Sequence, residues 1–280
     1  MERHMGFALN WAERKLHLAN VATAHLDALV LLEDTTKIDR ARLLSEPNKS
    51  LSESTLRQYK RKVLARAKHL PLAYIRSKSE FYGREFYINQ SVLEPRPESE
   101  TLIDEFLAIT KHEPAIKTVI DIGTGSGALI ISAKLEKPDI VALGVDIDPK
   151  CLVVARKNAA KHNQKIDFYG GHLTSKIPKT VWNNGKTLVL ANLPYVPDDW
   201  QINQAATHEP AIAIFGGPDG LKLYRQLFKQ LAQLEKPPDW VLTEAMPPQH
   251  INLSQIAANA GYLTLTTNDF IQVYKHHVKI

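Results

Sequence analysis

The sequence of 280 residues is poor in cysteine and has no long apolar run. Cys151 is the only cysteine, which excludes a disulfide within the chain and a metal cluster built on several cysteines. The longest apolar runs, such as Leu29 to Leu32 and Ala128 to Ile131, fall far below the ~20 residues that a membrane-spanning helix needs. The first residues contain no apolar core of a signal peptide. We therefore expect a soluble cytoplasmic protein with no membrane association.

An excess of one charge is also missing. The 35 Lys and Arg residues exceed the 30 Asp and Glu residues by only five. This mildly basic balance is compatible with a partner that works on RNA or the ribosome, but it is too weak to indicate direct nucleic-acid binding, and we expect none. The hydrophobic fraction of 44% and the charged fraction of 23% are typical of a globular protein of one or two domains, so disorder is not indicated.

Residues 8 to 70 are predicted to form helices. Apolar side chains between Leu16 and Val30 recur with a spacing of about 3.6 residues. A short second helix is expected from Arg40 to Leu44. Ser52 then offers an N-cap for a third, basic helix that continues through Arg66, whose basic face is most simply a solvated surface. We expect residues 1–70 to form a small helical domain.

A different pattern begins at Pro71. Aromatic and polar residues alternate around Gly83, which predicts a β-hairpin within residues 71–95 that links two domains. Two prolines then stiffen the chain and position Arg96 between them. Ser99 and the acidic residues beside it favour the start of a helix that runs to about Ile109.

Residues 96–280 alternate apolar strands with helical patterns, which predicts a mostly parallel sheet in an α/β domain. A helix is expected after a glycine-rich loop, another is opened by Pro149, and a third runs from Leu221 to Leu234. The fold class we predict is α/β, a Rossmann-like seven-stranded domain with a small N-terminal helical domain. Its strands are expected at Thr118 to Asp121, Ile140 to Asp146, Ile166 to Tyr169, Thr187 to Ala191, Trp240 to Glu244, Tyr262 to Thr266 and Phe270 to Tyr274.

The glycine-rich loop Gly123-Thr124-Gly125-Ser126-Gly127 follows the first of these strands. Glycines at this place let the backbone turn sharply and approach a ligand, and the following helix offers free N–H groups. Asp146 ends the next strand ~20 residues further on, a spacing that suits a carboxylate accepting hydrogen bonds from ribose hydroxyls. From the loop alone, a nicotinamide dinucleotide and S-adenosylmethionine both remain possible ligands.

Asn192-Leu193-Pro194-Tyr195 directly follows the apolar strand Thr187 to Ala191. Polar groups at the carboxyl end of a sheet strand lie where open α/β folds bind ligands, although Asn and Pro are also common turn residues. Such a turn can hold a planar amide or amino group and pack an aromatic ring beside it. The first strand runs into the glycine loop through Asp121. The carboxylate of Asp121 suits the ammonium of a methionine moiety better than a pyrophosphate. The two features together resemble a class I methyltransferase, whose signature on planar nitrogens is Asn/Asp-Pro-Pro-Tyr.

Further blocks, in the same order along residues 25 to 275, are similar to the peptide release-factor glutamine methyltransferases. Each block alone is common, whereas the ordered set is specific. The blocks are Pro71-Leu72-Ala73-Tyr74-Ile75, Phe81-Tyr82-Gly83, Glu94 to Glu100, Asp121 to Ala128, His208-Glu209-Pro210, and Phe215 to Leu221 followed by Tyr224-Arg225.

The resemblance implies transfer of a methyl group from S-adenosylmethionine, giving S-adenosylhomocysteine, to the amide of the glutamine in the Gly-Gly-Gln tip of class 1 release factors. It implies a helical domain that recognises the substrate. We also expect a monomer and no metal, although the sequence leaves the oligomeric state open. Residues implied in cofactor binding are Asp121, Gly123, Thr124, Gly125, Ser126, Gly127, Asp146, Leu173 and Asn192, with Leu173 and His172 near the adenine. Asn192, Leu193, Pro194 and Tyr195 are implied in substrate binding, and Asn192, Pro194 and Tyr195 in catalysis.

Two positions depart from the family pattern. The family usually has Pro where this chain has Leu193, and Asp where it has His172. Asn-Leu-Pro-Tyr is also the form seen in ribosomal RNA adenine dimethyltransferases, so an adenine-N6 methyltransferase acting on RNA or DNA remains the alternative. A third hypothesis is a cofactor-binding adaptor without enzymatic activity.

Overall fold

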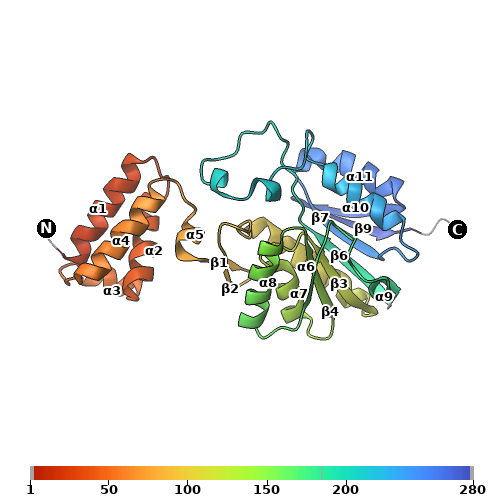
Figure 1. The fold of residues 1–280 in the computed structure, drawn as a ribbon, viewed down its shortest axis with the longest axis horizontal. Helices are drawn as coiled ribbons and strands as arrows, with labels where there is room; N and C mark the ends of the chain where they lie inside the picture. The colour runs from red at the N-terminus through yellow and green to blue at the C-terminus, as the bar shows by residue number, and fades with distance from the viewer. Residues whose placement is uncertain (1–2, 184, 278–280) are drawn as a thin grey trace. The chain divides into compact units, whose positions relative to one another are not determined.

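The computed structural model describes residues 3–183 and 185–277, which form two compact units (Figure 1). The first unit takes in the chain up to Ser77 together with the segment Asn203–His208. The second holds Lys78–Ile202 and the chain from Glu209 onward. No sequence feature had assigned residues 203–208 to the helical unit. The carbonyl oxygen of Lys68, with which the His208 ring hydrogen-bonds at 3.1 Å, lies in this same unit.

The first unit is a bundle of helices around an apolar core. Ser52 accepts a hydrogen bond from the Thr55 N–H at 3.1 Å, so the expected N-cap is confirmed. The buried Tyr59 hydroxyl donates to the Ala28 carbonyl at 2.9 Å, which ties the last long helix to the second. No helix within the described ranges is long and apolar enough to cross a membrane. The helices are α1 (Met5–Leu18), α2 (Ala24–Thr36), α3 (Arg40–Ser45), α4 (Glu53–Arg66) and α5 (Leu72–Arg76).

The second unit is built on a seven-stranded sheet with the order β5-β4-β3-β6-β7-β9-β8. The strands from β5 to β7 are parallel, and β9 runs antiparallel to both of its neighbours. The predicted seven-stranded Rossmann-like fold is therefore confirmed. The strands are β3 (Ile116–Ile122), β4 (Val141–Asp146), β5 (Asp167–Gly170), β6 (Lys186–Ala191), β7 (Trp240–Glu244), β8 (Tyr262–Asn268) and β9 (Ile271–His276).

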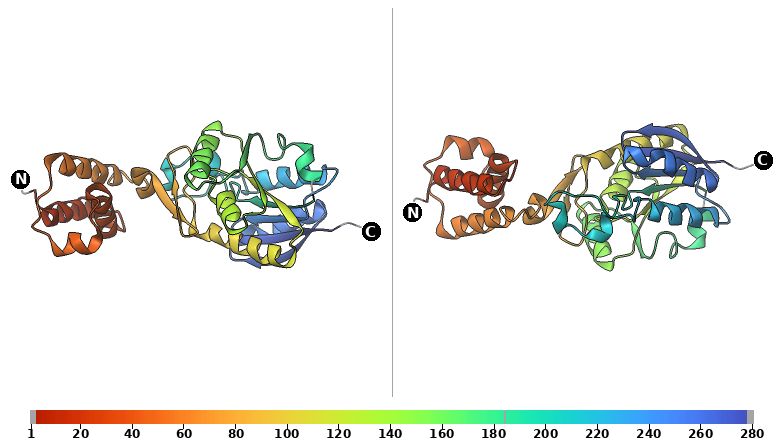
Figure 2. Two further views of the ribbon diagram at one scale, coloured as in Figure 1. Left: turned by 90° about the horizontal axis from the view of Figure 1, so that it is seen from below. Right: turned by 90° about the horizontal axis from the view of Figure 1, so that it is seen from above.

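Helices cover both faces of this sheet (Figure 1, Figure 2). Alternate strand residues point to opposite faces, so Val119 packs in one apolar cluster and Ile120 in the other. The first cluster includes α6 (Glu100–His112), α7 (Ala128–Glu136) and α8 (Pro149–Lys161). The second includes α9 (Lys179–Asn183), α10 (Lys222–Ala232) and α11 (His250–Asn259). Neither α9 nor α11 was predicted.

A two-stranded hairpin, β1 (Lys78–Phe81) and β2 (Arg84–Tyr87), precedes the sheet, as expected from the alternating pattern. Tyr82 and Gly83 form its turn and both have positive φ, the geometry that matches the twist of a hairpin. Phe81 and Phe86 are fully buried in the cluster that also holds α6 and α7. The hairpin is thus part of the core of the second unit.

The strand order reverses between β3 and β6. The next strand after β3 in the chain, β4, lies on one side of it, whereas β6 lies on the other. Crevices for ligands form at such a switch point, outside the carboxyl ends of the strands. Asp121, near the end of β3, pairs in register with Gly144 of β4 and Leu190 of β6. The glycine loop and Asn192 are therefore brought to the same edge of the sheet.

Candidate functional site

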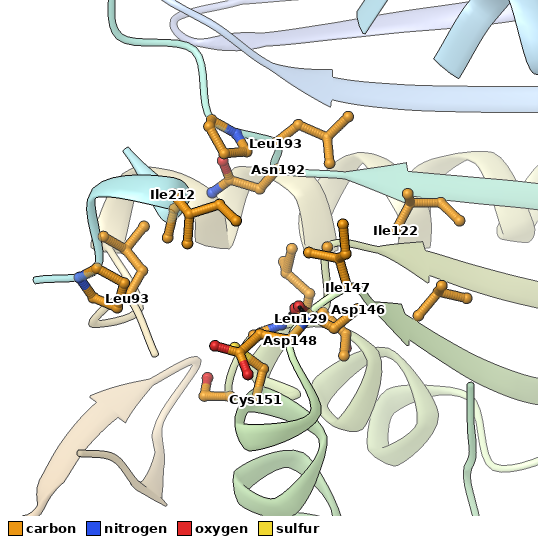
Figure 3. A pocket seen from close by; sticks show the side chains of 18 of the residues that line it. Leu93, Ile122, Leu129, Asp146, Ile147, Asp148, Cys151, Asn192, Leu193 and Ile212 are labelled. Atoms are coloured by element: carbon orange, nitrogen blue, oxygen red, sulfur yellow. Dashed lines mark hydrogen bonds between the residues drawn. The ribbon is translucent and has the colours of Figure 1, made fainter. Parts of the chain in front are cut away.

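A cavity of about 320 Å³ opens at this edge of the sheet (Figure 3). Asn192 and Leu193 lie on one side of it, and Asp146, Asp148 and Cys151 on the other. Of the predicted site residues, three do not line the cavity: Asp121, Gly127 and Tyr195. Those that do are Gly123, Thr124, Gly125, Ser126, Asp146, Leu173, Asn192, Leu193 and Pro194.

The glycine loop has the geometry that only glycine adopts without strain. Gly123 has φ of +79°, and a Cβ atom there would lie 2.9 Å from Leu193 Cδ2. The N–H groups of Gly123 and Thr124 both donate to the Val145 carbonyl, at 2.8 and 2.9 Å. Gly127, with φ of +80°, is the N-cap of α7. The loop therefore brings the end of β3 against the Asn192 turn, and Gly127 shapes the loop without facing the cavity.

Asp146 is nearly buried at the end of β4. Its Oδ2 accepts the Gly125 N–H at 2.9 Å, and its Oδ1 accepts the Asp148 N–H at 2.9 Å. Burial raises the pKa of Asp146, against the effect of these two hydrogen bonds. Each carboxylate oxygen has a second lone pair, so Asp146 can also accept from the hydroxyls of a ligand in the cavity.

Asp121 lies fully buried under the loop. Its Oδ2 accepts the Thr124 hydroxyl at 2.7 Å, whereas its buried Oδ1 has no hydrogen-bond partner in the described parts of the chain. Burial raises the pKa of Asp121 to about 7. An unpartnered buried carboxylate oxygen suits a cationic neighbour. The contact with a ligand ammonium stays a prediction, because the side chain stands behind the cavity wall.

Asn192 and Tyr195 belong to one hydrogen-bond network. The Asn192 amide Nδ2 donates to Ser99 Oγ at 2.8 Å, and the Ser99 hydroxyl donates to Glu244 Oε2 at 2.5 Å. The Tyr195 hydroxyl donates to Glu244 Oε1 at 3.0 Å. Burial, aided by the charge of Glu244, raises the pKa of Tyr195, so its phenol stays protonated. Tyr195 thus stands behind the cavity wall, where it is held by Glu244.

Leu193 is held by its backbone. Its N–H donates to the Tyr224 hydroxyl at 3.2 Å, and that hydroxyl also contacts the carbonyl oxygens of Ala191 and Glu244. Tyr224 is fully buried, and its hydroxyl connects the end of β6 to the end of β7. A proline has no N–H for this bond. The Leu193 N–H therefore gives the turn a backbone restraint that a proline at this position would lack.

The sequence did not reveal several residues that organise the site. Asn158, fully buried in α8, donates to the carbonyl oxygens of Ser126 and Tyr87, both at 2.8 Å, and accepts the Tyr87 N–H at 2.7 Å. It fastens the glycine loop to the hairpin. Nothing local marks this asparagine. Glu244 had one signal, since it is a carboxylate that ends an apolar strand.

Arg96, which lines the cavity, belongs to an ion pair. Arg96 Nη2 donates to both carboxylate oxygens of Glu209, at 2.7 and 2.8 Å, and the Glu209 side chain is almost fully buried. Pro210 and Ile212, just after Glu209, line the cavity together with Arg96. Two distant segments are thereby joined beside the cavity. That the flanking prolines position Arg96 stays a prediction.

Two family models match the chain. One, described as the PrmC N-terminal domain, matches residues 8–76, and the other, ribosomal protein L11 methyltransferase (PrmA), matches residues 103–193. The chain is 32% identical over 240 residues to the release factor glutamine methyltransferase of Koribacter versatilis, which covers 85% of this chain and 84% of that protein. The corresponding protein of Bacillus cereus is 34% identical over 229 residues and 80% of each chain. A bifunctional methyltransferase of Rickettsia typhi is 31% identical over 91% of this chain, which spans only 52% of that longer protein.

Solved structures share the fold at low identity. The catalytic domain of hMettl16 in complex with an RNA hairpin superposes with a TM-score of 0.55 at 14% identity, over 81% of this chain and 83% of that chain. The 16S rRNA N2 G1207 methyltransferase of T. thermophilus gives a TM-score of 0.50, also at 14% identity, over 72% of this chain and 50% of its own. These likenesses concern the fold alone.

Proposed function

Because this chain belongs to the family of release factor glutamine methyltransferases, we propose that it methylates the side-chain amide of the glutamine in the Gly-Gly-Gln motif of class 1 release factors. The methyl donor is S-adenosylmethionine, and S-adenosylhomocysteine is released. The observation that carries the proposal is the Asn192 amide, held at the cavity wall by Ser99 next to the glycine loop.

The cavity residues fit this cofactor. Asp146 has free lone pairs for ribose hydroxyls, and Leu173 and His172 line the wall where we place the adenine. The orphaned oxygen of Asp121 suits the positive charge of the methionine ammonium. When bound, S-adenosylmethionine supplies an electrophilic methyl group on its sulfonium sulfur. Residues Gly123 to Ser126 of the glycine loop line the cavity.

Asn192 and Leu193 orient the substrate amide. A primary amide nitrogen is a weak nucleophile because its lone pair is delocalised into the carbonyl. The Asn192 side-chain oxygen and the Leu193 carbonyl oxygen can each accept a hydrogen bond from one of the two N–H groups of this nitrogen. The Leu193 carbonyl oxygen accepts no hydrogen bond from the described residues. These two acceptors fix the nitrogen in one orientation and stabilise the positive charge that develops on it. Pro194 stiffens the turn between them and Tyr195.

The proton leaves without a dedicated base. An amide nitrogen that has gained a methyl group is a strong acid, so water suffices to take its proton. Tyr195 remains protonated and bonded to Glu244, so it acts by packing behind the turn. We assign recognition of the body of the release factor to the helical unit, whose residues 8–76 match the PrmC N-terminal domain.

The proposal is tested by incubating the protein with S-adenosylmethionine labelled in its methyl group and with either a class 1 release factor or total RNA. We expect label in the release factor, confined to the glutamine of its Gly-Gly-Gln motif by mass spectrometry. A release factor in which that glutamine is replaced by alanine is the matched control and should gain no label. Label only in RNA would overturn the proposal in favour of the adenine-N6 alternative, and no transfer to either would favour a cofactor-binding adaptor.

A further inference from the structure

Glu244 has no part in the proposed chemistry, yet it ends β7 beside the reactive turn. Ala191 of β6 pairs in register with Thr243 of β7, so Asn192 and Glu244 are the next residues along two adjacent parallel strands. Glu244 is 1% exposed. A carboxylate buried at this depth is costly unless hydrogen bonds satisfy it, so its partners indicate what it does.

The partners of Glu244 determine the direction of the network. The hydroxyls of Ser99 and Tyr195 each donate to one carboxylate oxygen of Glu244, so both point their protons at this side chain. The single hydroxyl proton of Ser99 is then donated to Glu244. Ser99 Oγ can only accept from Asn192, and this requires the NH2 side of the Asn192 amide.

From this geometry we infer that Glu244, acting through Ser99, orients the Asn192 side-chain amide with its oxygen toward the substrate. The inference rests on the proposed function, in which that oxygen accepts an N–H of the glutamine amide. If the Asn192 amide were turned over, its NH2 would face the NH2 of the substrate, and two donors would meet. Glu244 and Ser99 are therefore positioning residues, and the amide of Asn192 is the group that touches the substrate.

Glu244 also holds the other end of the turn. The Tyr195 hydroxyl bonds to Oε1 while Ser99 bonds to Oε2, so one carboxylate fixes Asn192 and Tyr195 together. Without Glu244 the Ser99 hydroxyl could donate to the Asn192 oxygen instead, and both orientations of the amide would be accessible. The carboxylate removes this ambiguity.

Glu244→Gln tests the inference, because glutamine keeps the shape but replaces one acceptor oxygen with an NH2 group, which only donates. We expect kcat for methylation of the release factor to fall about tenfold, the effect of losing about one hydrogen bond in the transition state. The KM for the release factor and the Kd for S-adenosylhomocysteine should stay within about threefold, since neither depends on the amide orientation alone. Ser99→Ala should lower kcat in the same direction. Ser132→Ala, a buried serine of α7 without a hydrogen-bond partner in the described chain, is the matched control and should leave kcat unchanged.

A second measurement does not depend on activity. In protein labelled with ¹⁵N-asparagine, the side-chain NH2 resonances of Asn192 are identified by their loss in Asn192→Ala. We expect them to shift in Ser99→Ala and in Glu244→Gln but not in Ser132→Ala. The inference is overturned if these resonances do not move, or if they move while kcat of both variants stays within about twofold of the wild type. A wild-type protein that methylates no release factor would refute the proposed function, and the resonances would still decide whether Glu244 orients the amide.

Discussion

Carboxylates at the two ends of the parallel strands lie in opposite environments, ion-paired at one end and buried at the other. At the amino end of the parallel strands, Glu113 accepts from Lys186 and Lys275, both at 2.7 Å, and these bonds lower the pKa of Glu113 to about 2. At the carboxyl end, the buried carboxylates of Asp121 and Glu244 accept hydrogen bonds from hydroxyl groups, and burial raises the pKa of each.

We therefore expect the carboxylates at one end of the sheet to contribute to stability and those at the other end to contribute to function. An ion pair that is stronger in the folded state stabilises the fold, whereas a buried carboxylate whose charged form is disfavoured destabilises it. Groups with strongly raised pKa values concentrate at functional sites because their environment is arranged for a ligand. Loss of a carboxylate at the amino end is therefore expected to lower stability. At the carboxyl end it is expected to impair binding and catalysis and to remove a buried charge that destabilises the fold.

The largest effect is expected for Asn192→Ala at the carboxyl end. We expect kcat for methylation of the release factor to fall at least 10³-fold, because the acceptor that orients the amide nitrogen is lost, while the Kd for S-adenosylhomocysteine changes little. Single-turnover kinetics with isothermal titration calorimetry measure the two quantities. Near-normal turnover in this variant would remove Asn192 from the mechanism.

Asp121→Asn should change the pH dependence of stability. The pKa of Asp121 is about 7 in the folded protein against 3.8 unperturbed, so the folded state binds this proton more tightly between the two values. The free energy of unfolding should therefore fall as the pH rises from about 4 to about 7, by at most ~4 kcal/mol. Urea denaturation across this range should show a flatter dependence in the variant. Parallel curves for variant and wild type would contradict the raised pKa.

Asp146→Asn should weaken cofactor binding. Loss of hydrogen bonds to a charged acceptor costs about 1.5–3 kcal/mol, so we expect the Kd for S-adenosylhomocysteine to rise about 10- to 100-fold. Calorimetric titration measures this change. Asp167→Asn, an exposed aspartate at the start of β5, is the matched control. An unchanged Kd in Asp146→Asn would place the ribose elsewhere.

The smallest effect is expected for Glu113→Gln at the amino end. Because the pKa of Glu113 is lowered from 4.5 to about 2, its ion pairs stabilise the fold above pH ~4.5, and this contribution is lost as the pH falls toward 2. The variant should lose about 1 kcal/mol of unfolding free energy at pH 7 and almost nothing near pH 2, with unchanged methyl transfer. Reduced activity at undiminished stability would show that the two ends are not separate.

Sequence patterns predicted most of the framework, and the failures have physical causes. Trp240 to Glu244 was expected as a strand and is one, since a short run of buried apolar residues is a local signal. Helix α11 was missed because its Asn and Ser residues favour turns, and only the burial of Leu253 and Ala257 against the sheet stabilises it. Helix α9, with five residues, is too short to show a period.

The family and the fold class, both predicted from ordered motifs, are confirmed by relatives that match most of the chain and by the seven-stranded sheet. The assignment of individual site residues and the domain limits at residues 70 and 95 remain predictions. The cavity does bring the glycine loop, Asp146 and Asn192 together, whereas Asp121, Gly127 and Tyr195 stand behind its wall.

The sequence by itself determined the glycine loop, the carboxylates Asp121 and Asp146 at the ends of their strands, and the turn from Asn192 to Tyr195. Each of these features is a local pattern of neighbouring residues. Only the tertiary structure decided how that turn is held. Ser99 and Glu244 are 145 positions apart, and Asn192 lies 93 positions from Ser99. No local sequence pattern can predict such a contact, because it exists only once β6 and β7 lie side by side and Ser99 packs at their ends.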